Sequence, residues 1–170
     1  TYLLDTYKEN DLTYDSFNKG KLESQLAYDG NYKAYFEFIA DSLKRYSSQR
    51  DKQKGEAFVH GFTLAMTSQN QFYRPISELD NDGGYADIFL SPLCDIYKDM
   101  VDSYIIELKY CKTNTADEQL QVLFKEASAQ ICRYANSDIV KESVKTTKLH
   151  KLVVIYRGAE MIMCEEVTEE

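Results

Sequence analysis

The sequence lacks the features that mark membrane, secreted and zinc-binding proteins. It has no apolar run near the roughly 18 residues that a membrane helix needs, and no basic-then-apolar signal peptide at its N-terminus. Its four cysteines form no CxxC pair, which favours reduced core thiols over a disulfide framework or a zinc site. We therefore expect a cytoplasmic protein with no membrane partner, in which any metal is bound through oxygen ligands.

The chain also lacks an excess of positive charge and a nucleotide-binding loop. A net charge of -8 argues against a broad electropositive surface for nucleic acid, although it allows a local basic groove. Gly20-Lys21 is followed by Leu22, so the chain contains no GxxxxGK[ST] motif. What it does have is 170 residues, 44% of them hydrophobic, which is enough to bury a core of its own.

Apolar spacing predicts a helical first part. Residues 31–47 carry one apolar stripe at helical spacing, shorter helices precede them, and Gly30 is a plausible helix stop. The polar segment 47–55 is the best linker candidate. We therefore predict a helical N-terminal extension over residues 1–50 and a second domain over residues 51–170.

The second part alternates between helical and strand patterns. Helical spacing covers 55–68 and 116–136, whereas strand patterns cover 71–80, 85–92, 102–110, 148–158 and 160–167. The first two strands flank the turn residues Asn81-Asp82-Gly83-Gly84 and predict a hairpin. The order α-β-β-β-α-β-β predicts an α/β fold with a mixed central sheet flanked by helices.

The third strand carries two charges inside an apolar run. Glu107 and Lys109 project from the same face as Ile105, and apolar residues line both faces. An exposed salt bridge at a sheet edge is one interpretation, but interior charges are costly unless they are paired or bind a metal. Asp87 lies within the preceding apolar strand. We expect Asp87, Glu107 and Lys109 to converge, with carboxylate oxygens within about 6 Å of each other and able to share one Mg²⁺.

These residues resemble a known family. Gly84-Tyr85-Ala86-Asp87, followed after 19 residues by Glu107-Leu108-Lys109, is similar to the core of the PD-(D/E)XK nuclease superfamily, with Ala86 where the motif name has proline. Glu56 stands where many members place a helical acid, and Gln130 with Tyr134 is similar to a Gln-x-x-x-Tyr motif. In detail the sequence resembles the nuclease-like domain found C-terminal to AAA-type ATPases. An opening on Thr1 instead of Met fits a chain whose ATPase domain lies upstream.

The resemblance implies a role for each matched residue. Magnesium or manganese would be held by the Asp87 and Glu107 carboxylates, the Leu108 carbonyl and Glu56, directly or through water. Lys109 would orient the attacking water or offset charge on the phosphate, and Gln130 and Tyr134 would brace Lys109 or contact a phosphate. The implied activity is hydrolysis of nucleic-acid phosphodiesters, with DNA preferred to RNA.

Several alternatives stay open at this point. The chain could be a non-catalytic module of the same fold that serves binding or regulation, since fold does not settle function. Glu56 could be a solvated first-turn acid, Tyr134 could serve packing alone, and His60 fits a surface or core position better than a metal site. Lysines in the segment 141–151 could contact phosphate, although a solvated loop is the simpler interpretation.

Overall fold

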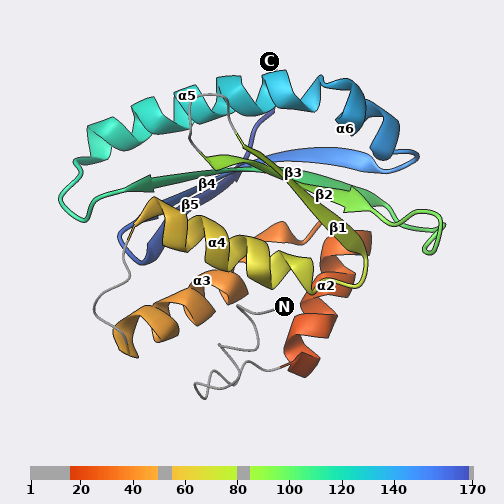
Figure 1. Ribbon diagram of the computed structural model, residues 1–170, viewed down its shortest axis with the longest axis horizontal. Helices are drawn as coiled ribbons and strands as arrows, with labels where there is room; N and C mark the ends of the chain where they lie inside the picture. The colour runs from red at the N-terminus through yellow and green to blue at the C-terminus, as the bar shows by residue number, and fades with distance from the viewer. Residues whose placement is uncertain (1–15, 50–54, 80–84, 169–170) are drawn as a thin grey trace.

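The computed structural model describes residues 16–49, 55–79 and 85–168. They form a mixed five-stranded sheet with helices on both faces (Figure 1), which confirms the predicted α/β class. The elements in chain order are α2 (Ser16–Asp29), α3 (Tyr32–Gln49), α4 (Glu56–Ser68), β1 (Tyr73–Leu79), β2 (Tyr85–Pro92), β3 (Asp102–Cys111), α5 (Asp117–Ala135), α6 (Asp138–Ser143), β4 (Lys148–Arg157) and β5 (Glu160–Glu166).

The strands lie in sequence order across the sheet, from β1 to β5. Neighbouring strands are antiparallel except β3 and β4, which run parallel and are joined through α5 and α6 as a crossover. The pairing of β1 with β2 confirms the predicted hairpin, while its turn residues 80–84 lie outside the described residues. The crossover puts β3 in the middle of the sheet, where both of its faces are covered.

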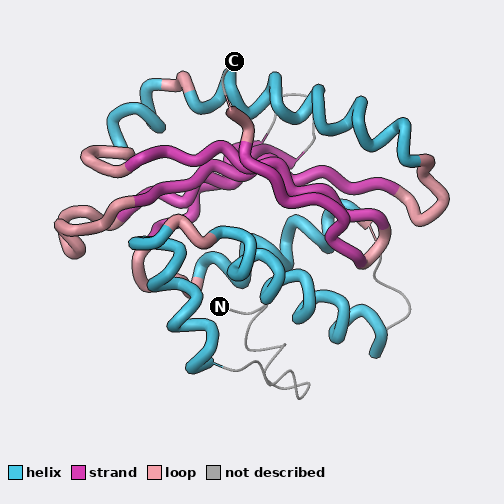
Figure 2. The backbone as a smooth tube through the Cα atoms, turned by 180° about the vertical axis from the view of Figure 1, so that it is seen from behind, coloured by secondary structure: helices cyan, strands magenta, loops and turns pink. Residues whose placement is uncertain are grey.

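The two faces of the sheet carry different helices (Figures 1 and 2). Helices α2, α3 and α4 cover one face, and α5 and α6 cover the other. The larger core lies on the first face, where apolar residues of all three helices pack against alternate residues of the strands. Four fully buried tyrosines belong to this core: Tyr35, Tyr73, Tyr104 and Tyr156. The division into an extension over 1–50 and a domain over 51–170 stays a prediction.

The N-terminal helices follow from local sequence. The apolar stripe predicted over 31–47 becomes α3, whose buried side chains lie at helical spacing. Helix α2 ends at Asp29, and Gly30 follows with a φ of 66°, a left-handed conformation that glycine adopts without steric cost. This confirms Gly30 as a helix stop. The helix expected near residues 1–10 lies outside the described part of the chain.

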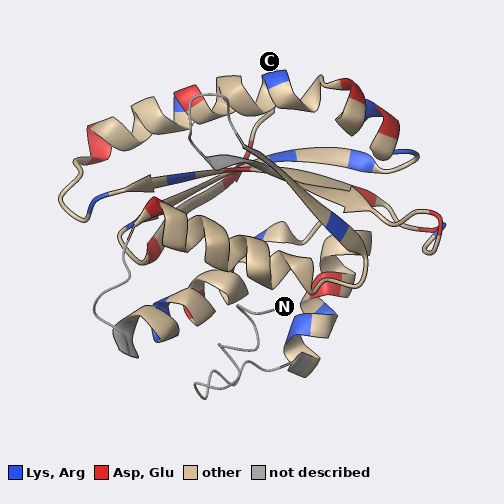
Figure 3. Ribbon diagram, in the orientation of Figure 1, with Lys and Arg blue, Asp and Glu red and all other residues tan. Residues whose placement is uncertain are grey.

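Helix α5 is amphipathic and confirms the helix predicted over 116–136. Leu120, Ala127 and Ile131 are buried against the sheet. Figure 3 shows acidic and basic residues interspersed along α5 and α6, so this side of the molecule presents mixed charge to solvent. No helix within the described ranges is long and apolar enough to cross a membrane.

The cysteines behave as core thiols. All four are free, with Cys111 and Cys164 buried and the other two half-buried. Burial raises the pKa of the Cys164 thiol to about 12, so it stays protonated at neutral pH. No disulfide joins any of the four cysteines in the described structure.

Candidate active site

Strand β3 carries the candidate active site on its α5-facing side. Tyr104, Ile106 and Leu108 belong to the core on the opposite face, whereas Ile105 packs with Ile131 of α5. Side chains alternate along a strand, so Glu107 and Lys109 share the face of Ile105. The sequence prediction that the two charges lie on one face is thus confirmed, and that face is covered by a helix.

Glu107 and Lys109 form a buried ion pair. The Lys109 Nζ lies 2.6 Å from Glu107 Oε1. The Glu107 side chain is 1% exposed and the Lys109 side chain is 24% exposed, so the ammonium lies between the buried carboxylate and solvent. The interpretation as an exposed salt bridge at a sheet edge is therefore wrong, because β3 is an interior strand and the Glu107 side chain is buried.

Gln130 joins this pair from helix α5. The Lys109 Nζ donates a hydrogen bond of 3.1 Å to Gln130 Oε1. The amide and the carboxylate together fix the position of the ammonium from two elements of the fold. The sequence prediction that Gln130 faces Lys109 is confirmed.

Tyr134 lies one helical turn after Gln130 and packs in the small core between α5 and the sheet. Its neighbours there include Phe89, Ile105 and Ile131, and its hydroxyl oxygen is buried. Packing is thus one role of Tyr134. Its predicted contact with Lys109 or with a phosphate stays a prediction.

Asp87 belongs to β2, next to β3. The antiparallel pairs between the two strands include Ile88 with Ile106 and Phe89 with Ile105, and Asp87 lies one residue beyond the last of these pairs. The Asp87 side chain lies outside the described residues, so its predicted approach to Glu107 stays a prediction. Among side chains that the structure does describe, no group of three or more His, Cys, Asp or Glu residues could hold a metal ion.

Helix α4 covers the other face of the sheet. Glu56 is exposed in its first turn, and no contact among the described residues joins it to Glu107 or Lys109. A role in the metal shell stays a prediction for Glu56. His60 is buried in the same helix, with Nε2 3.5 Å from Ser77 Oγ of β1, which fits the core position favoured for it.

The lysines of the segment 141–151 lie at the other end of the β3–β4 pair from Lys109. Lys148 pairs with Asp102 at the start of β3, whereas Lys109 pairs with Ile155 near its end. The interpretation of 141–151 as one loop is wrong, because the segment begins in α6 and ends in β4, and only residues 144–147 connect them. Lys145 and Lys148 are exposed, and phosphate contact by these lysines stays a prediction.

Sequence reasoning missed a second cluster of titratable side chains, centred on the buried His150. The His150 ring lies between two carboxylates, with Nε2 2.7 Å from Asp102 Oδ1 and Nδ1 2.7 Å from Glu166 Oε1. It also stacks on Tyr104, with ring centroids 5.0 Å apart. The three residues come from β3, β4 and β5, so only the strand pairing brings them together, and His150 is not the ordinary strand residue that its sequence suggests.

Comparison with known proteins identifies the family to which the chain belongs. A model of the PD-(D/E)XK nuclease superfamily matches residues 54–166, which is more than half of the chain. No curated protein and no solved structure matches the chain. The matched segment runs from the start of α4 to the end of β5 and contains the Glu107, Lys109 and Gln130 arrangement. The chain therefore belongs to the PD-(D/E)XK nuclease superfamily.

Proposed function

We propose that this chain is a metal-dependent nuclease domain that hydrolyses nucleic-acid phosphodiesters, DNA in preference to RNA. The observation that carries the proposal is the fully buried Glu107 carboxylate beside the partly exposed Lys109 ammonium, in a member of a nuclease superfamily. Burying a carboxylate is costly, and a purely structural interior strand gains nothing from one. A catalytic site needs that combination of a fixed anion and a reachable cation.

The residues present fit a hard divalent cation. The candidate ligands are the Glu107 carboxylate, the Leu108 backbone carbonyl and the carboxylate of Asp87, which belongs to β2, the strand paired with β3. All are oxygen donors, which suits Mg²⁺ or Mn²⁺ and not the softer metals that prefer Cys and His. When bound, such a cation polarises a phosphodiester and lowers the pKa of its bound water.

Lys109 and Gln130 supply the protein's own part of the chemistry. The ammonium of Lys109 is held 2.6 Å from Glu107 and 3.1 Å from the Gln130 oxygen, so it needs little rearrangement when a phosphate arrives. Its positive charge offsets the negative charge that builds on the phosphate during attack. Gln130 acts through Lys109 as a positioning residue.

Cleavage assays with single- and double-stranded DNA and RNA test the proposal. Cleavage should require Mg²⁺ or Mn²⁺, and Lys109→Ala should slow it about a hundredfold or more while metal affinity is largely kept. Asp87→Ala should lose cleavage together with metal affinity, measured by calorimetric titration. Lys98→Ala, an exposed lysine on a loop, is the matched control and should behave as the unmutated protein.

The same assays distinguish the rival function. If the unmutated protein binds nucleic acid but cuts none of these substrates with any divalent metal, a non-catalytic module of the nuclease fold is the better account. The net charge of -8 is the feature that favours this rival.

We further propose that the domain works in the cytoplasm as part of a longer chain with an ATPase domain. This proposal rests on the resemblance to nuclease-like domains that follow AAA-type ATPases. Reading the gene upstream of Thr1 tests the ATPase association, and cell fractionation tests the location. A reading frame without an ATPase domain would contradict it.

A further inference from the structure

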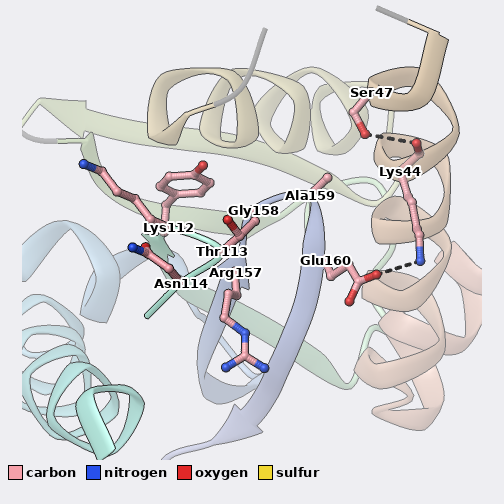
Figure 4. Close-up of a pocket in the computed structure, with 10 residues that line it drawn as sticks. Lys44, Ser47, Lys112, Thr113, Asn114, Arg157, Gly158, Ala159 and Glu160 are labelled. Atoms are coloured by element: carbon pink, nitrogen blue, oxygen red, sulfur yellow. Dashed lines mark hydrogen bonds and ion pairs between the residues drawn. The ribbon is translucent and has the colours of Figure 1, made fainter. Parts of the chain in front are cut away.

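A groove of about 930 Å³ opens at the end of the sheet where β3 terminates. It is lined from three parts of the chain, namely the C-terminal half of α3, the connection from β3 to α5, and the turn from β4 to β5. The residues that matter here are Lys44, Tyr110, Lys112, Arg157, Gly158 and Glu160. Figure 4 shows Lys44 and Lys112 on opposite sides of the groove, with Gly158 and Ala159 between them.

The charge of this groove differs from that of the chain as a whole. Three cations and one carboxylate line it, in a protein whose net charge is -8. Lys44 Nζ lies 2.9 Å from Glu160 Oε1, and this ammonium lowers the pKa of the Glu160 carboxyl. Both side chains are mostly exposed, so the pair is weak and an incoming anion can compete for Lys44.

The walls of the groove are held in place by hydrogen bonds. The Gly158 N–H donates a hydrogen bond of 2.9 Å to the carbonyl of Cys111, which fixes the β4–β5 turn to the end of β3. Arg157 uses Nη1 both for the Thr115 carbonyl at 3.3 Å and for Asp117 Oδ1 at 2.8 Å. A guanidinium has five N–H donors, so these contacts orient Arg157 without using all of them.

The position of the groove links it to the candidate active site. Lys112 follows Lys109 by three residues, which is a distance of about 10 Å along an extended strand. Lys109 faces α5, whereas Tyr110 packs with the core on the α2–α4 face, so one strand of nucleic acid contacts both places by passing around the end of β3. The half-buried ring of Tyr110, which also lines the groove, adds a surface on which a base can stack.

We propose that this groove binds the backbone of a single nucleic-acid strand that leads into or out of the site at Glu107 and Lys109. The inference rests on the proposed nuclease function and extends it by naming a single strand as the bound form. Cations around an open hollow with an adjacent aromatic ring suit single strands. A duplex presents two backbones and requires a broad basic surface, which the acidic chain opposes.

Two substitutions with opposite expected effects test the groove. Affinity for a labelled single-stranded oligonucleotide of about twelve nucleotides is measured by fluorescence anisotropy, in EDTA and over a range of salt. Lys112→Ala should weaken binding about two- to fivefold and reduce the salt slope by about 0.7. Glu160→Gln should strengthen binding by a similar factor, because it removes the carboxylate and frees Lys44. A gain in affinity cannot result from misfolding.

Each groove variant has a control of the same residue type in a similar position outside the groove. Glu165→Gln removes a carboxylate of β5 that also pairs with a lysine of α3, Lys33 at 3.5 Å, but outside the groove. Lys98→Ala removes an exposed lysine from another loop. Both should leave affinity unchanged.

Four results would each overturn the groove assignment. The oligonucleotide could fail to bind at low salt, or the groove variants could have the same affinity as their controls. A duplex could bind more tightly than the single strand, or inorganic phosphate at equal concentration could displace the oligonucleotide. Cleavage is measured in parallel with Mg²⁺. Binding with the expected pattern but no cleavage would reject the nuclease proposal and support the groove, whereas cleavage that is indifferent to the groove variants would reject only the groove.

Discussion

Replacing Lys109 by methionine tests the central pair of the site through stability. Methionine keeps most of the aliphatic length and removes the ammonium that lies 2.6 Å from Glu107. At that distance the attraction between unit charges is about 6 kcal/mol for an effective dielectric constant of about 20, before desolvation is subtracted. Removing one partner of a buried pair costs about 3–5 kcal/mol, because the other charge stays buried. We expect the free energy of unfolding to fall by about 3 kcal/mol, the lower end of this range, because the lysine side chain is 24% exposed.

Urea denaturation measures this loss directly. With an m-value of about 2 kcal/mol/M, the midpoint should fall by about 1.5 M. Added Mg²⁺ should stabilise Lys109→Met by about as much as the unmutated protein, because the variant keeps the oxygen ligands and bound metal stabilises the folded state by mass action. The double variant Glu107→Gln/Lys109→Met is the control and should show no such gain.

Two outcomes would refute this reasoning. If Lys109→Met loses less than about 0.5 kcal/mol, Glu107 is not held by the lysine as its burial implies. If Mg²⁺ stabilises the double variant as much as the single one, the cation acts elsewhere and Glu107 is not its ligand.

Three further predictions concern other parts of the molecule. His150→Ala should cost about 3 kcal/mol in urea denaturation, because Asp102 is buried and loses its partner, and Asp102→Asn in the same background should recover part of it. Gly158→Ala should cost about 2 kcal/mol, since φ is 63° and the new Cβ would lie 2.6 Å from Thr113 Cγ2, and Thr113→Ser should relieve only the steric part. Burial raises the pKa of Cys164 to about 12 and the pKa values of the four fully buried tyrosines named above, so the folded state holds these protons longer than the unfolded state. Stability should therefore fall as pH rises above about 9, by up to about 1.4 kcal/mol per pH unit and group, and urea midpoints that stay constant between pH 8 and 11 would contradict this.

The sequence alone determined the features that depend on local periodicity. Helices predicted over 31–47, 55–68 and 116–136 are observed within two residues at either end, because an apolar stripe at helical spacing needs no knowledge of its partner. The shared face of Glu107 and Lys109 follows in the same way from the alternation of side chains along a strand.

Tertiary structure decided which distant residues meet. Gln130 reaches Lys109 because α5 crosses over β3, and the sequence predicted that contact only through a motif resemblance. The His150 cluster and the groove at Lys112 carried no such motif. They depend on the parallel register of β3 with β4 and on the contact between the β4–β5 turn and the end of β3. Packing of the whole sheet sets that register, and no local propensity records it.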